Sequence, residues 1–319
     1  MNGNLLLIAR GSFYEWDGTR LVEHTELARQ LGAGVNQFYY VLQDRTGTMW
    51  FCTNIGIARK DDSKIEHIAP YGVAGVDLAL RAYEDHQGTV WAYKSLGLTR
   101  PASQEQEVMR LGTAARAIYS GRDGELWVGT NGDGLLRLKD RAVQMFTTDD
   151  GLPSNVAMAV LPSRKNIVWT GFNCGGLTAF DGQRFTAYNE KQGLSNSCVW
   201  SLAEDSRSDL WIGTWGGGLF RFRNGHFTQF SKPQGLPSDI VRSVVVAKDD
   251  SLWIGTEDGL SHMVNGRIHN YSTADGLSSN RVLAVYQDGA DAIWVGTSKG
   301  IDVLEGDRWR SLALDACHL

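Results

Sequence analysis

The chain of 319 residues can form one large all-β domain or two domains of ordinary size, and its 42% of hydrophobic residues are ample for a core. The formal net charge is −5 and no window concentrates lysine and arginine, so nucleic acid is not an expected partner. The longest apolar run near the start, residues 5–9, is far shorter than the ~20 residues of a membrane span or than a secretion signal, so we expect neither in this chain.

The first 28 residues predict three short strands. The segments NLLLIAR, SFYEWDG and TRLVEHTEL are rich in residues that favour a half-buried strand and are separated by turn residues. They correspond to the last three strands of a four-stranded unit that recurs along the chain. We therefore expect a partial sheet over residues 1–28.

A repeated motif organises the rest of the chain. The segment LWIGT at residues 210–214 recurs at 252–256, with close copies at 126–130 and 293–297 and weaker copies at 49–53, 90–94 and 168–172. Each copy carries a tryptophan, and these residues are Trp50, Trp91, Trp127, Trp169, Trp211, Trp253 and Trp294. Their spacings are 41, 36, 42, 42, 42 and 41 residues, and a period near 42 is typical of a propeller blade. We expect all seven tryptophans to be buried between sheets.

One period, residues 198–230, contains four short apolar strands joined by turns, which we number first to fourth. The turn before each second strand carries a residue that tolerates positive φ, three positions before the tryptophan: Gly47, Gly88, Gly124, Asn166, Ser208, Asp250 and Asp291. Acidic residues recur in phase at this turn, at Asp44, Asp85, Asp205 and Asp288. Capping of the turn explains these carboxylates better than catalysis or calcium binding does.

A second motif connects one four-stranded unit to the next. It reads DGLPSN at residues 150–155, QGLSNS at 192–197, QGLPSD at 234–239 and DGLSSN at 275–280. Its leucines, Leu152, Leu194, Leu236 and Leu277, recur in the same phase. We expect each leucine to pack beneath the crossing between two sheets.

The combined pattern GLxSNxVxSLAEDxxxxLWIGTxGGGLxRF resembles the two-component regulator propeller repeats, over about the last two thirds of the chain and more loosely over the first third. Such repeats build the periplasmic sensor regions of hybrid histidine kinases and related bacterial receptors. In these receptors a further β domain, a membrane helix and a signalling module follow the propeller. The resemblance implies a periplasmic sensor region whose downstream signalling domain is missing from this chain.

The predicted fold is all-β, a β-propeller of seven or eight four-stranded antiparallel blades in one domain of residues 1–319. Seven full blades occupy residues 36–312, and they start near Asn36, Asp77, Ala114, Val156, Cys198, Ile240 and Arg281. Two closures are open: eight sheets with an incomplete first blade, or seven closed blades with the N-terminal strands appended. The strand count favours eight, whereas the family resemblance favours seven.

Antiparallel order places the loop after each second strand and the connector before each first strand on one rim. Unlike residues occupy equivalent positions in these loops: Asn54, Asn131, Asn173, Trp215 and Glu257. A second variable position lies early in the first strand, at Tyr39, Leu80, Arg116, Met158, Trp200, Arg242 and Leu283. Loops on a rigid scaffold commonly carry binding residues. The candidate ligand-binding residues are therefore Arg116, Asn131, Asn173, Trp200, Trp215, Arg242 and Glu257.

Other chemistry is not expected. The glycines at 213–218 precede a strand and not a helix, which argues against a phosphate-binding loop. The four cysteines share no CxxC spacing and have no histidine partner at metal-ligand distance, so we expect no metal. We expect no cofactor either. Cys174 and Cys198 lie on the same rim in adjoining blades, and we interpret them as two small buried thiols, the alternative being a disulfide.

The sequence therefore predicts a non-catalytic sensor propeller that binds a small molecule or an oligosaccharide at this rim, where Trp200 and Trp215 can stack on sugar rings. One alternative is a protein-interaction scaffold that uses the same rim. The other is a propeller lyase, for which Glu257 is the single candidate acid or base on the rim.

Overall fold

The structure is a computed structural model that describes residues 5–9, 12–17, 20–32, 34–61, 64–68, 79–85, 87–94, 97–101, 107–110, 113–121, 123–139 and 142–312. The chain forms two compact units. The first comprises Met1–Leu126 and Leu138–Ala142, and the second comprises Trp127–Arg137 and Val143–Leu319.

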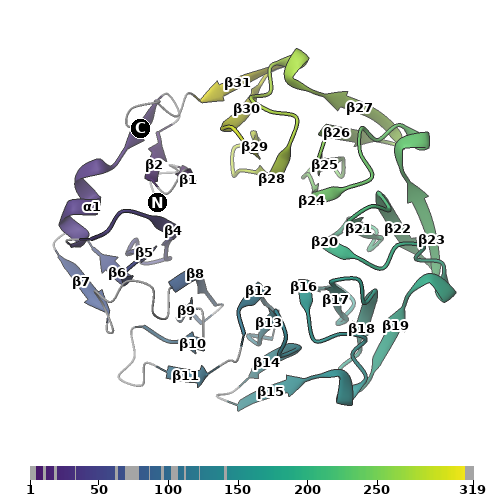
Figure 1. Cartoon of the computed structure of the whole chain (residues 1–319), viewed down its shortest axis with the longest axis horizontal. Helices are drawn as coiled ribbons and strands as arrows, with labels where there is room; N and C mark the ends of the chain where they lie inside the picture. Colours follow the sequence, from purple (N-terminus) through teal and green to yellow (C-terminus); the bar gives the residue numbers. More distant parts are fainter. Residues whose placement is uncertain are drawn as a thin grey trace. The chain divides into compact units, whose positions relative to one another are not determined.

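The described residues form eight antiparallel sheets, the blades of a β-propeller, of which the first has three strands and the others have four (Figure 1). The first sheet contains β1 (Leu5–Ala9), β2 (Ser12–Trp16) and β3 (Leu21–Glu23), and is followed by α1 (Thr25–Leu31). The next two contain β4 (Phe38–Gln43), β5 (Met49–Thr53), β6 (Gly56–Lys60) and β7 (Ile65–Ile68), then β8 (Ala79–Glu84), β9 (Val90–Lys94), β10 (Gly97–Thr99) and β11 (Glu107–Arg110). The fourth contains β12 (Ala115–Ser120), β13 (Leu126–Thr130), β14 (Leu135–Lys139) and β15 (Ala142–Phe146).

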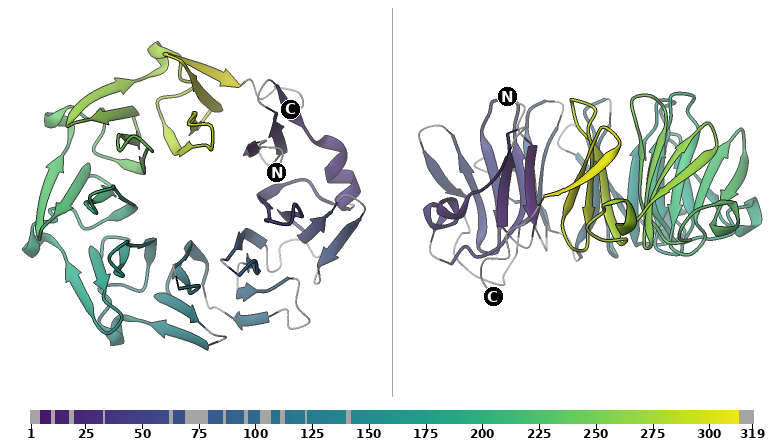
Figure 2. Two further views of the ribbon diagram at one scale, coloured as in Figure 1. Left: turned by 180° about the vertical axis from the view of Figure 1, so that it is seen from behind. Right: turned by 90° about the horizontal axis from the view of Figure 1, so that it is seen from above.

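The four remaining sheets belong to the second unit, and the views in Figure 2 show their strands from behind and from above. They contain β16 (Ala157–Pro162), β17 (Val168–Phe172), β18 (Leu177–Phe180) and β19 (Phe185–Tyr188); β20 (Val199–Glu204), β21 (Leu210–Thr214), β22 (Leu219–Arg223) and β23 (His226–Phe230); β24 (Val241–Val246), β25 (Leu252–Thr256), β26 (Gly259–Val264) and β27 (Arg267–Tyr271); and β28 (Val282–Gln287), β29 (Ile293–Thr297), β30 (Ile301–Glu305) and β31 (Arg308–Leu312). Within each of these sheets the strands follow one another in chain order.

The predicted fold class, an all-β propeller, is confirmed. The described residues form eight sheets with an incomplete, three-stranded first sheet, which is the first of the two predicted closures. One strand prediction was wrong: TRLVEHTEL was expected to form a single strand, but β3 ends at Glu23 and α1 begins at Thr25. The helix buries Leu27 and Leu31 in a core cluster with Phe13 and Phe51, which a continued strand would not reach. No helix in the described part of the chain is long and apolar enough to cross a membrane.

The recurring acidic residues cap the turn before the second strand, as predicted. The carboxylate of Asp205 accepts hydrogen bonds from the backbone N–H groups of Arg207 and Asp209 and from Nε1 of Trp211. The same indole bond occurs in three other sheets, from Trp50 to Asp44 (2.8 Å), Trp91 to Asp85 (2.7 Å) and Trp294 to Asp288 (2.8 Å). Six repeat tryptophans are buried, whereas Trp91 is half-buried, which corrects the expectation for that residue.

Replacement of Asp44 by Asn is expected to make stability less dependent on pH. Burial by itself would raise the pKa of Asp44, but hydrogen bonds from Thr46, Trp50 and Thr48 outweigh it and hold the pKa below its ordinary value. A carboxyl group with a lowered pKa stabilises the fold above about pH 4 and loses that contribution as the pH falls through the lowered pKa. Urea titration should show Asp44→Asn less stable by about 1–3 kcal/mol at pH 7, with the difference shrinking below about pH 4. An undiminished difference at pH 3 would contradict this assignment.

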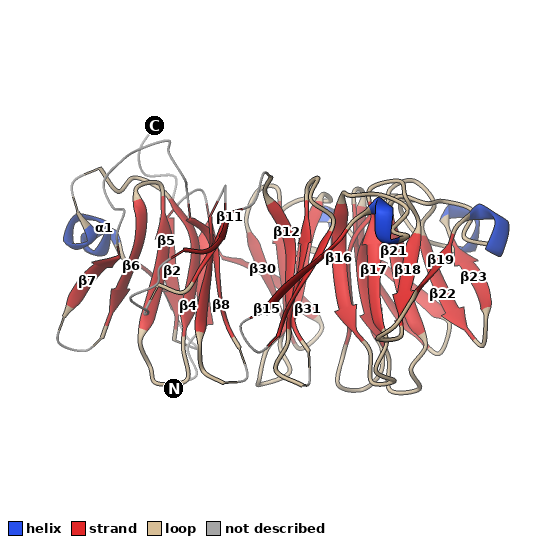
Figure 3. Ribbon diagram, turned by 90° about the horizontal axis from the view of Figure 1, so that it is seen from below, coloured by secondary structure: helices blue, strands red, loops and turns tan. Residues whose placement is uncertain are grey.

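The connector leucines are buried as predicted, with Leu194 and Leu236 each in the core cluster between two sheets of the second unit. Each connector begins with a short 3-10 helix, drawn blue in Figure 3: η1 (Thr148–Asp150), η2 (Glu190–Gln192), η3 (Lys232–Gln234) and η4 (Thr273–Asp275). A capping box closes each helix and a glycine with positive φ ends it. This local geometry brings the chain back to the next first strand and positions the rim.

Candidate functional site

The candidate site lies on the rim formed by the loops after the second strands and the connectors before the first strands, which we call the upper rim. In the second unit the N–H of Trp215 donates to the carbonyl of Cys198 within one sheet (2.9 Å). The N–H groups of Gly216 and Gly218 donate to the carbonyl of Asp239 (3.0 and 2.7 Å), in the connector to the next sheet. The glycines are needed here, because a Cβ at Gly218 would lie 2.3 Å from the carbonyl oxygen of Phe230. These loops therefore form a rigid edge and not a phosphate cradle.

The variable position of the first strand is the site of a β-bulge, which the sequence analysis did not anticipate. The pairing of β20 with β21 shifts between Val199 and Ser201, so Trp200 is the bulged residue. Arg242 occupies the same place between Val241 and Ser243 of β24. A bulge re-aims a side chain and is frequent beside functional sites. The bulge explains why this position varies while its neighbours keep to the repeat.

Four of the predicted residues form one continuous chain of contacts with Arg281, and we call these five residues the rim cluster. The rings of Trp200 and Trp215 stack with centroids 4.5 Å apart, and the guanidinium of Arg242 lies 4.8 Å from the ring centroid of Trp215. Nε of Arg242 donates to Oε2 of Glu257 (2.6 Å). Nε of Arg281 lies 2.9 Å from Oε1 of the same carboxylate. The cluster thus runs across three neighbouring sheets of the second unit.

The rim cluster contains both aromatic and polar groups, but its two indole rings stack on each other, whereas the sequence analysis expected them to stack on a ligand. Trp215 is 37% exposed, yet its ring already contacts Trp200 and Arg242, so it is not an open stacking platform. The indole Nε1 of Trp200 is buried and has no hydrogen-bond partner among the described residues. Both oxygens of Glu257 are held by arginines, which argues against its use as a catalytic base.

Three further candidates do not belong to the rim cluster. Asn131 and Asn173 lie on the upper rim of the second unit, where Asn131 bridges to Val156 and the N–H of Asn173 donates to the carbonyl of Val156 (3.0 Å). Arg116 is exposed on β12 in the first unit. Arg281 is the residue that sequence reasoning missed, although it stands one position before the first strand at the place of Cys198 and Ile240.

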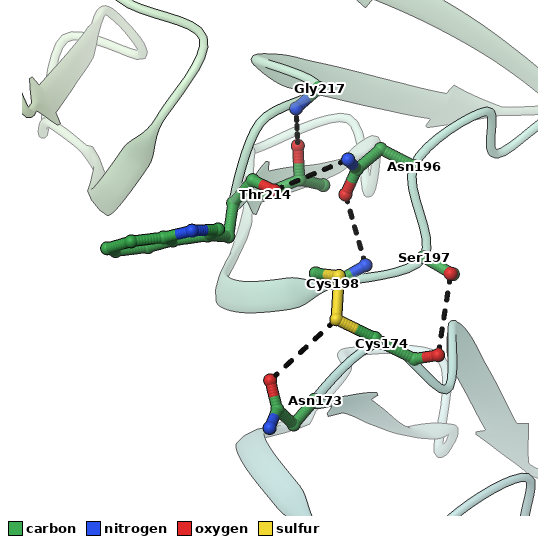
Figure 4. Close-up of a disulfide and its surroundings, with 8 residues drawn as sticks. Asn173, Cys174, Asn196, Ser197, Cys198, Thr214 and Gly217 are labelled. Carbon is green, nitrogen blue, oxygen red and sulfur yellow. Dashed lines mark hydrogen bonds between the residues drawn. A yellow bond between two sulfur atoms is a disulfide. The ribbon is translucent and has the colours of Figure 1, made fainter.

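The expectation of two buried thiols was wrong, because Cys174 and Cys198 form a disulfide (Figure 4). Cys174 is exposed and follows β17, whereas Cys198 is half-buried at the end of the next connector. The N–H of Cys198 donates to Oδ1 of Asn196, and the hydroxyl of Ser197 donates to the carbonyl of Cys174. The bond joins two neighbouring sheets at the upper rim, next to the residues that hold Trp215.

An Asp–Ser–His group in the second unit does not have the order of a nucleophilic triad. The hydroxyl of Ser251 donates to Oδ1 of Asp249 (2.7 Å) and lies 3.0 Å from Nε2 of His262. The serine proton therefore points to the carboxylate and not to the imidazole that would have to remove it. The ring of His262 stacks on Trp253 with centroids 4.0 Å apart, and burial lowers its pKa. This group is best explained as packing.

Comparison with known proteins agrees with the repeat pattern. Residues 193–216, 235–258 and 276–299 match the family described as two component regulator propeller. All five rim-cluster residues lie inside these three segments: Trp200 and Trp215 in the first, Arg242 and Glu257 in the second, Arg281 in the third. No curated protein sequence matches the chain.

Several solved structures share the fold at low identity. Virginiamycin B lyase from Staphylococcus aureus is 17% identical, with 82% of this chain and 93% of that chain covered and a TM-score of 0.61. PorZ of the type-IX secretion system of Porphyromonas gingivalis is 14% identical, with 93% and 44% covered and a TM-score of 0.53. The extracellular domain of a hybrid two component system from B. thetaiotaomicron is 18% identical, with 97% and 53% covered and a TM-score of 0.44, so this chain spans about half of its length.

Proposed function

Because the chain carries repeats of the two component regulator propeller family, we propose that it is a non-catalytic, ligand-binding sensor propeller of a bacterial signal-transduction receptor. Its ligand is a small molecule, with carbohydrates as the first class to test, and it binds at the rim cluster. The observation that carries the proposal is that unlike side chains from three successive repeats converge there, while the connector leucine and the tryptophan and Gly-Thr pair of the second strand recur around them.

The chemistry of the rim cluster suits a ligand with both an apolar face and hydroxyl groups. The part of the Trp215 indole that stays exposed provides an apolar surface. The half-buried carboxylate of Glu257 provides an acceptor, and the half-exposed guanidinium of Arg281 provides donors. Sugars combine these two needs, and the alternating polar and apolar groups of the rim cluster match them.

The disulfide supports the proposed periplasmic location. Disulfides form and persist in oxidising compartments and are rare in the cytosol. Cys174 is exposed, so its disulfide is open to reduction in a reducing compartment. In this proposal the ligand signal passes to a downstream signalling domain outside residues 1–319.

A second candidate, a protein-interaction scaffold, is favoured by two exposed apolar side chains. Leu283 and Tyr286 of β28 are 45% and 54% exposed. A contiguous exposed apolar patch marks a protein-interaction surface. Loss of partner capture in Leu283→Ser with Tyr286→Ser, together with intact capture in Trp200→Ala, would favour the scaffold over the sensor.

A thermal-shift screen of oligosaccharides followed by calorimetry tests the sensor proposal. Trp200→Ala and Arg242→Ala are each expected to weaken binding by about 1–3 kcal/mol, because each removes a group from the centre of the rim cluster. Arg207→Ala is the matched control, since Arg207 is an exposed arginine in the turn on the opposite rim. Unchanged affinity in both cluster variants, with loss in Arg207→Ala, would place the site elsewhere.

A further inference from the structure

The disulfide between Cys174 and Cys198 is open to solvent at one end. Cys174 follows β17 and is exposed, whereas Cys198 is half-buried one position before β20. Exchange of a disulfide begins when a thiolate reaches one of its two sulfur atoms, and access decides which one is attacked. A thiol in solution therefore meets the sulfur of Cys174 first.

Cys174 stands at a loop position where the neighbouring repeats have glycine. Its φ is 56°, in the left-handed region, and Gly132 and Gly216 hold the same place after β13 and β21, also with positive φ. The other six non-glycine residues with positive φ in the described part of the chain are asparagine, aspartate or serine, whose side chains can hydrogen-bond the local backbone. Cysteine has no such support, so the disulfide itself keeps this residue in an unfavourable conformation. We expect the loop to relax when the bond opens.

Cys198 connects the disulfide to the rim cluster. Its carbonyl accepts from the N–H of Trp215 (2.9 Å), and its own N–H donates to Oδ1 of Asn196 (3.1 Å). Nδ2 of Asn196 donates in turn to the carbonyl of Trp215 (3.3 Å). Both backbone polar groups of Trp215 are therefore bonded to Cys198 or to the residue that fixes Cys198.

The loop around Trp215 has little room to absorb a shift of this connector. A Cβ at Gly217 would collide with the Cβ of Asn196, so the loop backbone lies directly against that side chain (Figure 4). Trp200, the bulged residue of β20, lies two positions after Cys198 and stacks on Trp215. A displacement of Cys198 is therefore expected to reach both indole rings.

We propose that the Cys174–Cys198 disulfide is a thiol-exchange site that regulates the rim cluster, with low-molecular-weight thiols as its substrates. The closed bond keeps Trp200 and Trp215 in their stacked arrangement, and opening of the bond releases it. The regulatory meaning rests on the proposed function, because the rim cluster is the ligand site proposed above.

The exchange takes place in two steps. A thiolate attacks Sγ of Cys174, the S–S bond breaks, and its electron pair leaves with Sγ of Cys198, which takes up a proton from water. The small thiol is now joined to Cys174 as a mixed disulfide. A second thiolate attacks the sulfur of that bound thiol, and Cys174 leaves and is protonated. Two small thiols are thereby oxidised to one disulfide, while the protein gains two electrons and two protons.

Circular dichroism of the full chain in glutathione redox buffers tests the proposal without a ligand. Stacked indoles couple their electronic transitions and give a paired positive and negative band, which is assigned here as the part of the spectrum lost in Trp215→Ala. All proteins carry Cys317→Ser, so that Cys52 is the one cysteine outside the pair. Burial raises the pKa of Cys52 to about 12 and keeps this thiol from exchange.

Reduction is expected to remove most of the paired band while the strand signal persists. Peptide mass spectrometry should find the glutathione adduct on Cys174. The double variant Cys174→Ser with Cys198→Ser should match the reduced protein in every buffer. Asp205→Asn is the control for lost stability, because it removes the hydrogen bond from Trp211 on the opposite rim and leaves the disulfide intact, so it should keep the paired band.

Three results would overturn the proposal. They are an unchanged paired band after complete reduction, loss of the strand signal together with the band, and an equal loss of the band in Asp205→Asn with its disulfide closed. The first would show that the bond does not control the rim cluster, and the other two that the band follows overall stability. A failed oligosaccharide screen counts against the proposed function alone, so the two proposals fail separately.

Discussion

Trp211→Ala is expected to lower the free energy of unfolding by about 3–5 kcal/mol, the range for removing a large buried aromatic side chain. Trp211 is 6% exposed, and it packs with Leu219, Leu236 and Val241 in the core between two sheets. Its Nε1 donates to Oδ2 of Asp205 (3.0 Å), so the substitution also leaves a buried acceptor without its donor. Urea titration followed by circular dichroism measures the change.

The matched control for this variant is Trp215→Ala. Trp215 lies four residues later in the chain, is 37% exposed and belongs to the rim cluster, so its loss should cost well under half as much. Trp91→Ala should lie between the two, because Trp91 is half-buried but keeps its hydrogen bond to Asp85. A loss below about 1 kcal/mol for Trp211→Ala would show that the second strand does not face the core as assigned.

The double variant Cys174→Ser with Cys198→Ser is expected to unfold with about 3 kcal/mol less free energy than the oxidised protein. The disulfide closes a loop with a sequence separation of 24 residues, and the chain-entropy cost of such a loop in the unfolded state is of that size. It also joins the loop after β17 to the connector before β20, so its loss removes a link between two sheets.

A reductant serves as the control for the disulfide. Dithiothreitol should lower the stability of the wild-type protein to that of the double variant, and should leave the double variant unchanged. Cys52 does not complicate the comparison, because burial raises its pKa to about 12 and suppresses the reactive thiolate. Equal stability of the reduced and oxidised wild-type protein would show that the bond contributes nothing to folding.

The fold was predictable because each blade repeats its own local chemistry. The six-residue spacing from Asp205 to Trp211 spans one turn and brings carboxylate and indole together within a single hairpin. Likewise all seven turn residues chosen for tolerance of positive φ adopt it, including Ser208, the least favourable type. These contacts join residues that are close in the sequence. The residues that make them therefore recur at a fixed spacing from blade to blade, and this spacing is visible in the sequence alone.

The rim residues were predictable as a set, but not their arrangement. Departure from the repeat identified Trp200, Trp215, Arg242 and Glu257, since a position that varies while its neighbours repeat is free of the packing constraint. The sequence did not show that these side chains contact one another, because that depends on the β-bulge in β20 and β24 and on loops from neighbouring sheets. The sequence also did not show that Arg281 belongs to the rim cluster, because its contact with Glu257 joins two neighbouring sheets.

By itself the sequence determined the all-β class, the blade period, the capped turns, the buried connector leucines and the candidate rim. Only the tertiary structure decided the features that depend on distant segments: the disulfide between Cys174 and Cys198, the helix α1 in place of a longer strand, and the contacts that join the rim-cluster residues. The physical reason is that burial and pairing energies between sheets outweigh local propensity of a few tenths of a kcal/mol per residue. Residues 25–31 therefore form a helix, because the helix buries Leu27 and Leu31 against the neighbouring strands.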